Sequence, residues 1–132
     1  MDNIVTFCGH KNILSNMYKV KLCKHGKIFN SSEALYQYEK SIFHNRHDIA
    51  IKIINSKNGY DEKRVAKQIQ ENSSWNCVKV EKMRQVLQVK CQQCSDFQSV
   101  LKTHKGKLFV ETTFDKFWGA GSKNITLSTF KR

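Results

Sequence analysis

The stretch NSSEALYQYEKSIFH, from Asn30 to His44, decides the fold of this chain. It opens on three polar residues that favour the N-cap of a helix, so a helix is predicted from about Ser32 to His44. Leu35, Tyr38 and Ile42 recur at helical spacing and form the stripe that such a helix buries. The stretch therefore predicts a core helix in the first third of the chain.

The same helix carries a second, polar face. Glu33, Tyr36, Gln37 and Lys40 stand at i, i+3, i+4 and i+7, so they share one side of the helix. A carboxylate, a phenol, an amide and an amine together suit the floor of a polar pocket. A structural alternative stays open: with Asn30 as the N-cap, Glu33 occupies the capping-box position and complements the helix dipole.

Further helices and strands are predicted on both sides of this stretch. Alternating apolar and basic residues indicate a strand at Tyr18–Leu22, a turn at Lys24–Lys27 and a return strand at Ile28–Phe29. The remaining predicted elements are strands at 4–7 and 108–112, helices at 47–56, 61–71 and 75–91, and a helical turn or two from 96. The pattern predicts an α+β fold: a single compact domain over residues 1–132, mostly helical, with a small β-sheet built from both ends of the chain.

The chain is strongly basic. Its 132 residues carry a net charge of +12, from 23 Lys and Arg against 11 Asp and Glu. Such an excess attracts a polyanion such as nucleic acid, or favours a phosphorylated substrate. It also fits a Lys-rich surface that only keeps the protein soluble. Charge alone leaves these three explanations open.

Cysteine usage and hydropathy bear on location. Five cysteines are an odd number in a chain whose start lacks the pattern of a signal peptide, which predicts free thiols in a reducing cytosol. No apolar run approaches the ~20 residues that span a membrane. We therefore expect a cytoplasmic protein with no membrane partner.

The carboxylates are few enough to consider one by one. Asp61, Glu62 and Glu71 are among those expected in polar, solvated settings. After such residues and the helix starts are set aside, Glu33, Glu111 and Asp115 are left as candidates for acid–base chemistry.

The segment ETTFDKFWGAG, residues 111–121, is unusually aromatic for a loop. Trp118 lies between an aromatic residue and flexible glycines, which suggests stacking on a flat, polar ligand. Gly119 and Gly121 let backbone amides approach an anion such as a phosphate. Trp75, by contrast, opens an amphipathic helix and is expected in the core.

Neither a metal nor a cofactor is predicted. Cys91 and Cys94 form a single pair with only His104 at a plausible distance, whereas zinc prefers four ligands. The sequence contains no phosphate-binding loop and no dinucleotide-binding glycine fingerprint.

An ordered set of residues along the chain resembles the NADAR (YbiA-like) family. The set comprises Phe7, LSNMY at 14–18, Gly26, SEALYQYEK at 32–40, Trp75, Met83, Lys90, LKT at 101–103, VE at 110–111, FWGAG at 117–121 and Asn124. The sequence departs from the family pattern at Ala34, where many members have His, at residues 68–70, and in a reduced ending after Asn124.

The resemblance implies a YbiA-like α+β fold and N-glycosidase activity. Family members hydrolyse the ribose C1′–N bond of early riboflavin-pathway intermediates, or remove ADP-ribose from modified guanine bases. By this resemblance, Glu33 is the central catalytic carboxylate. The residues implied to complete the pocket are Lys40, Trp75, Asp115 and Trp118, with Ser15 and Asn16 as a substrate-facing pair.

N-glycoside cleavage builds positive charge at C1′ of the sugar. Glu33 could stabilise that charge or activate water, and Asp115 or Gln37 could assist the leaving base. Lys40 has three open roles: binding phosphate, attacking C1′ of a ring-opened ribose as a Schiff-base nucleophile, or pairing with Glu33.

The expected partner is a phosphorylated ribosyl or ADP-ribosyl substrate, which includes ADP-ribosylated DNA, bound by a monomer. The competing hypothesis is a non-catalytic basic module that binds ADP-ribose or nucleic acid.

Overall fold

A computed structural model of the chain describes residues 4–7 and 11–111. The elements are β1 Ile4–Phe7, β2 Leu22–Lys24, β3 Lys27–Phe29, α1 Ser32–Phe43, α2 His47–Ile54, α3 Gly59–Ala66, α4 Ser73–Gln93, α5 Ser95–Thr103 and β4 Leu108–Glu111. The predicted α+β fold, mostly helical with little sheet, is confirmed.

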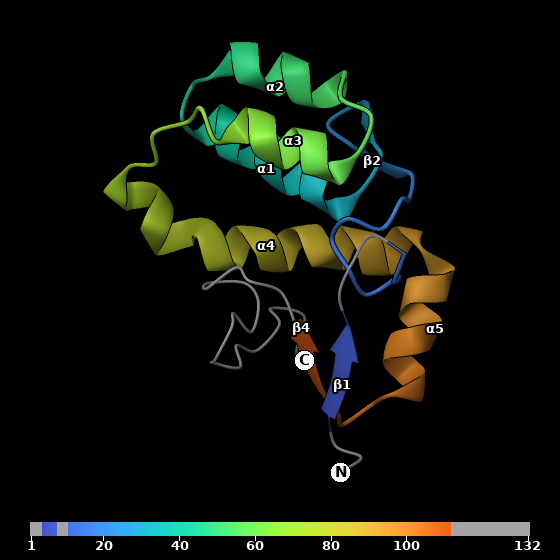
Figure 1. The fold of residues 1–132 in the computed structure, drawn as a ribbon. Coiled ribbons are helices and arrows are strands. Elements are labelled where there is room, and N and C mark those ends of the chain that lie inside the picture. Colours follow the sequence, from blue (N-terminus) through green and yellow to red (C-terminus); the bar gives the residue numbers. More distant parts are fainter. Residues whose placement is uncertain (1–3, 8–10, 112–132) are drawn as a thin grey trace.

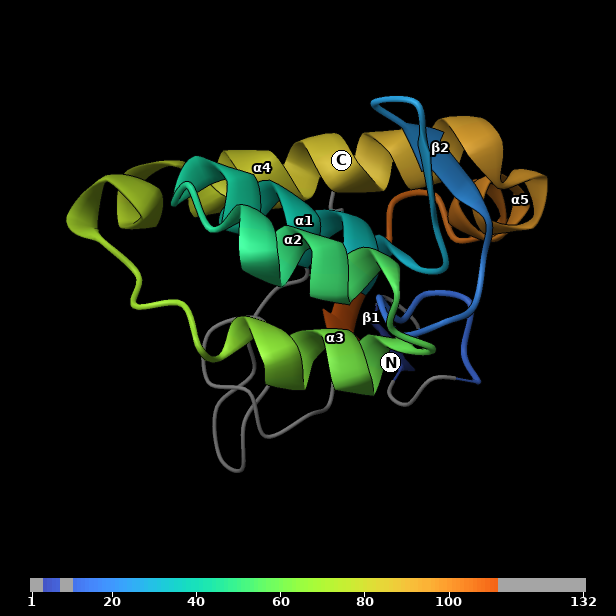
Figure 2. The same cartoon turned by 90° about the horizontal axis from the view of Figure 1, so that it is seen from above.

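The long helix α4 runs across the molecule between two groups of elements (Figure 1). On one side, α1 packs against α4 and also against α2 and α3. On the other side of α4 lies the pair of strands β1 and β4 (Figure 1). Seen from above, α1 lies between α4 and α2 (Figure 2), so the predicted core helix is the centre of the helical layer.

The two ends of the described chain meet in one parallel pair of strands. β1 pairs with β4 in a register that sets Ile4 opposite Leu108 and Phe7 opposite Glu111. This confirms the sheet predicted from both ends of the chain.

A second, antiparallel pair forms the predicted hairpin. His25 and Gly26 connect β2 to β3, both with positive φ (57° and 71°), which is the backbone of a tight hairpin turn and favours glycine. The first strand lies later in the chain than predicted, because β2 spans Leu22–Lys24 and overlaps the predicted Tyr18–Leu22 only at Leu22. Its expected start is occupied by a turn, in which the Tyr18 amide donates to the Ser15 carbonyl at 3.2 Å.

The core lies between α1 and its neighbours. Leu35 of α1, Ile49 and Ile53 of α2, and Val86 of α4 are completely buried. Trp75 is also fully buried, as its position on an amphipathic helix predicted. Helices α1, α2 and α4 therefore bury apolar residues at the helical spacing that their sequence period indicates.

Two sequence-based expectations about location can be compared with the described residues. Cys23, Cys77, Cys91 and Cys94 are free thiols in this part of the chain. Within residues 4–7 and 11–111, no helix combines the length and apolar character needed to cross a bilayer.

Candidate functional site

Four polar side chains of α1 lie inside the protein. Glu33, Tyr36, Gln37 and Lys40 are only 7%, 4%, 5% and 7% exposed, respectively. Burying four polar side chains costs free energy unless each of them forms hydrogen bonds or ion pairs. The spacing predicted that these residues line one pocket with Trp118, which lies outside the described residues, so their common pocket stays a prediction.

Glu33 does not occupy the capping-box position of its helix. The N-cap is Ser31, whose side-chain oxygen accepts a hydrogen bond from the Ala34 amide at 3.0 Å, so Glu33 stands at the second helical position. The capping alternative based on Asn30 is therefore wrong. The Glu33 carboxylate instead accepts a hydrogen bond from Gln37 Nε2 at 2.5 Å, which fixes the carboxylate within the protein.

The loop that carries Ser15 and Asn16 is joined to the start of α1. The Asn16 carbonyl accepts from the Glu33 amide at 2.9 Å, and Asn16 Oδ1 accepts from the Ser32 hydroxyl at 2.8 Å. Ser15 is 1% exposed, and its hydroxyl oxygen accepts from the Met17 amide at 3.0 Å. Asn16 thus bonds to the start of α1 and helps to position Glu33, whereas the Ser15 hydroxyl bonds within its own loop. The contact of either side chain with substrate stays a prediction.

Lys90 of α4 donates hydrogen bonds to the backbone of this loop. It is completely buried, and Nζ donates to the Ile13 carbonyl at 2.7 Å and to the Ser15 carbonyl at 3.0 Å. The ammonium group also lies 4.4 Å from the centre of the Phe97 ring. Desolvation by burial lowers the pKa of Lys90 to about 7. The sequence signal for this residue was its place in register with the apolar stripe of α4.

Lys40 pairs with a carboxylate that the sequence did not single out. Its Nζ donates to Glu71 Oε2 at 2.8 Å, across 31 residues of chain. Glu71 was expected in a solvated setting, and its side chain is indeed 38% exposed while it forms an ion pair with a buried lysine. The described ion pair of Lys40 therefore runs to Glu71 rather than to Glu33.

Glu62 of α3 is the site residue that the sequence analysis missed, since a solvated setting was expected and its exposure is 1%. The Ser31 hydroxyl donates to Oε1 at 3.3 Å, while Oε2 has no hydrogen-bond partner among the described residues. Desolvation raises the pKa of Glu62 to about 8, against the hydrogen bonds from Asn30 and Ser31, and the charge of Glu33 adds to the rise. The sequence did contain a signal that Glu62 is buried. Glu62 precedes Ala66 and Ile69, which were predicted to face inward, by four and seven positions, and this spacing places residues on one face of a helix.

Trp75 belongs to the core rather than to an open pocket. It is 0% exposed and its ring lies 5.7 Å from that of Tyr36 and 5.2 Å from that of Phe43, between ring centres. Its Nε1 finds no hydrogen-bond partner among the described residues. Trp75 therefore packs against Tyr36 on the polar face of α1 from inside the core. The substrate contact implied by the family resemblance stays a prediction.

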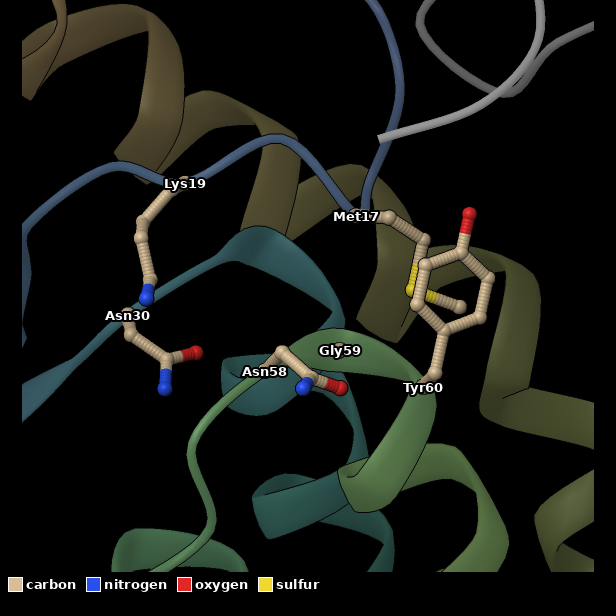
Figure 3. Close-up of a pocket in the computed structure, with 6 residues that line it drawn as sticks. All are labelled: Met17, Lys19, Asn30, Asn58, Gly59 and Tyr60. Atoms are coloured by element: carbon tan, nitrogen blue, oxygen red, sulfur yellow. The ribbon is translucent and has the colours of Figure 1, made fainter. Parts of the chain in front are cut away.

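A pocket of about 290 Å³ opens beside Glu33, between the loop after Asn16, the end of β3 and the start of α3 (Figure 3). Its lining residues are Met17, Lys19, Asn30, Asn58, Gly59 and Tyr60. Gly59 lies between the pocket and Glu33: a Cβ at this position would lie 3.5 Å from Glu33 Cβ, in ordinary contact, and 3.3 Å from Met17 Cα. The absence of a side chain at Gly59 therefore lets the start of α3 lie close against the Met17 backbone.

The C-terminal part of the predicted site lies outside the described residues. This applies to Asp115, Trp118, Gly119 and Gly121, whose roles stay predictions. Among residues 4–7 and 11–111, no group of three or more His, Cys, Asp or Glu side chains is placed to hold a metal ion.

Comparison with known proteins shows what this chain is similar to. A family model described as NADAR domain matches residues 6–130. A solved structure, the NMR structure of the E. coli protein YbiA, superimposes with a TM-score of 0.78 at 22% sequence identity, covering 93% of this chain and 75% of that one. No curated protein matches. Because the family model spans nearly the whole chain, the protein belongs to the NADAR family.

Proposed function

We propose that this protein is an N-glycosidase that hydrolyses the ribose C1′–N bond of a phosphorylated or ADP-ribosylated base. Membership of the NADAR family supports glycosidase chemistry in general. The observation that carries the proposal is the Glu33 carboxylate, 7% exposed, held by Gln37 and located beside a pocket. A fixed carboxylate with little access to water is suited to act on a cation that forms in the reaction.

The chemistry needs a negative charge near C1′. As the C1′–N bond breaks, the sugar acquires oxocarbenium character, and a carboxylate stabilises that charge or accepts a proton from the attacking water. Gln37 holds one Glu33 oxygen, at 2.5 Å, and orients the carboxylate for this task. We assign protonation of the departing base to Asp115.

The contacts of Lys40 support an electrostatic role. Its amine lies 2.8 Å from the Glu71 carboxylate, so the nitrogen is engaged in an ion pair and does not lie in a purely aromatic environment. A nucleophilic amine must be neutral with a free lone pair. We therefore favour Lys40 as a cation that balances charge at the site or binds substrate phosphate.

Two substrate classes fit this proposal: ribosylamino-pyrimidine phosphates of riboflavin synthesis, and ADP-ribose attached to guanine, including in DNA. The net charge of +12 supports a polyanionic or phosphorylated substrate. The same charge supports the second candidate function, a module that binds ADP-ribose or nucleic acid without turnover.

Turnover by purified protein tests the proposal. The protein is incubated with riboflavin-pathway intermediates and with ADP-ribosylated guanosine or DNA, and the freed base or ADP-ribose is measured by mass spectrometry. Glu33→Gln keeps the shape and removes the charge, and it is expected to lower the rate by at least about 100-fold. Glu81→Gln is the control, because Glu81 is 56% exposed and its ion pair in the described part of the chain is with the exposed Arg84.

The outcomes separate the two candidate functions. Turnover by the wild type and the Glu81 variant but not by Glu33→Gln supports the glycosidase. Wild-type turnover by Glu33→Gln removes Glu33 from the mechanism. Tight, strongly salt-dependent binding with no turnover of any substrate supports the binding module instead.

A further inference from the structure

A short segment, residues 12–18, joins helix α4 to the start of α1, and we call it the bridging segment. On the α1 side, the Asn16 carbonyl accepts a hydrogen bond from the Glu33 amide at 2.9 Å. On the α4 side, Asn16 Nδ2 donates to Met83 Sδ at 3.7 Å, and Lys90 Nζ donates to two carbonyls of the segment. Contacts made by α4 therefore bear on the place of the Glu33 backbone.

The Glu33 amide is one of the amides for which a helix supplies no acceptor of its own. Ser31 is the N-cap, so Glu33 is the second helical residue, and the first four amides of an α-helix lack a carbonyl one turn earlier. The Asn16 carbonyl supplies the acceptor instead. If the bridging segment shifts, this amide loses its acceptor at the candidate catalytic residue, which costs free energy.

The hydrogen bonds inside the bridging segment are local. The Ser15 amide donates to the Asn12 carbonyl at 2.9 Å, and the Tyr18 amide donates to the Ser15 carbonyl at 3.2 Å. Such bonds give the turn its shape, but they do not fix where the turn lies on the protein. Leu14, which is 3% exposed, attaches the segment by packing, and Lys90 attaches it by two directional hydrogen bonds.

A charged side chain at position 90 is costly. Lys90 is completely buried, and its Nζ lies 4.4 Å from the centre of the Phe97 ring and 6.0 Å from that of Tyr18. Buried charged groups contribute little to stability, because well-packed apolar residues often replace them without loss. Stability alone therefore does not account for a lysine here, whereas its N–H groups, directed at the bridging segment, do.

We propose that Lys90 is a positioning residue for Glu33. Its ammonium group holds the Ile13 and Ser15 carbonyls, and the adjoining Asn16 carbonyl holds the Glu33 amide, so that the carboxylate keeps its place. The role rests on the proposed N-glycosidase function, since it concerns the carboxylate that the reaction uses. Lys90 acts on catalysis through the backbone and does not touch the substrate.

Amide hydrogen exchange followed by NMR tests the positioning without any substrate. Lys90→Met keeps the length of the side chain and removes its N–H groups. It is expected to lower the protection of the Glu33 amide at least about tenfold relative to the Ile53 amide, because hydrogen bonds from a charged group are lost. Ile53 is the reference because its helix, α2, lies on the far side of α1 from α4 (Figure 2).

Lys102→Met is the matched control, since it makes the same chemical change at an exposed position of α5. It is expected to leave the ratio of Glu33 to Ile53 protection within about threefold of the wild-type ratio.

Steady-state kinetics tests the consequence for catalysis. A misplaced catalytic group slows the chemical step more than it weakens substrate binding. Lys90→Met is therefore expected to lower kcat per folded molecule at least about tenfold and to change KM less than about threefold. A lysine that serves only the stability of the fold leaves kcat per folded molecule unchanged, with the folded fraction measured by circular dichroism.

Several results overturn the proposal. One is a folded Lys90→Met protein whose protection ratio stays within about threefold of wild type, and another is an equal loss in Lys102→Met. If Lys90→Met does not fold, Lys90→Gln replaces it. Its shorter side chain keeps an N–H donor but does not span both carbonyls, so a loss of about threefold to tenfold is expected and an unchanged ratio contradicts the proposal.

The two measurements keep this proposal separate from the proposed function. Lowered Glu33 protection with unchanged kcat overturns the role of Lys90 in catalysis. Absence of turnover in the wild type contradicts the N-glycosidase alone, because the exchange measurement still shows whether Lys90 positions Glu33.

Discussion

Replacing Glu62 by Gln is expected to remove an unusual pH dependence of stability. Glu62 is 1% exposed and bonds to the Ser31 hydroxyl, and desolvation raises its pKa in the folded protein to about 8 from an ordinary 4.5. Gln has nearly the same shape and does not titrate. The difference between the two proteins therefore isolates the proton on Glu62.

The magnitude follows from the shift in pKa. A group whose folded-state pKa is raised stabilises the fold fully below its unfolded pKa, here 4.5, and this contribution is lost as the pH rises through about 8. Each pKa unit corresponds to about 1.4 kcal/mol, so wild-type protein should lose up to about 5 kcal/mol of unfolding free energy over this window relative to Glu62→Gln. That is a large share of the ~5–15 kcal/mol typical of a folded domain.

Urea denaturation at pH 5, 6, 7 and 8, followed by circular dichroism, measures the effect. Glu81→Gln serves as control, because its exposed ion pair contributes little and wild-type pH dependence should persist. The reasoning is refuted if the wild type and Glu62→Gln lose stability in parallel between pH 5 and 8, since Glu62 would then ionise alike in the folded and unfolded chains.

The remaining predictions concern the two buried lysines and metals. Lys90 has a folded-state pKa of about 7 against an ordinary 10.5, so the wild type should gain stability as the pH rises between these values, and Lys90→Met should not; a gain of equal size in both contradicts the assignment. Lys40→Arg should keep part of the hydrolytic activity, because a guanidinium also pairs with Glu71 and contacts phosphate, and borohydride should trap no adduct on the wild type. A trapped ribose adduct together with an inactive Arg variant would identify Lys40 as the nucleophile. Activity should persist in EDTA, and a loss reversed by a divalent ion would show that a metal takes part.

The contacts that complete the candidate site join residues that are far apart in the sequence. Lys40 forms an ion pair with Glu71, Ser31 donates a hydrogen bond to Glu62, and Lys90 donates one to the Ser15 carbonyl. The partners are separated by 31, 31 and 75 residues, respectively. No local spacing predicts such pairs. Glu62 and Lys90 do fall in register with apolar stripes, but whether a charged side chain on a stripe is buried depends on what packs over it.

Sequence alone indicated the helices, the strands apart from the position of β2, and the polar face of α1, because periodicity and capping act over a few neighbouring residues. It also indicated that strands from both ends form one sheet, and β1 and β4 do pair. Only the tertiary structure decided that Ser31 caps α1, that Glu62 and Lys90 are buried, and that Gly59 lies between a pocket and Glu33. The physical reason is that desolvation and close packing depend on residues distant in the chain, which only the folded protein brings together.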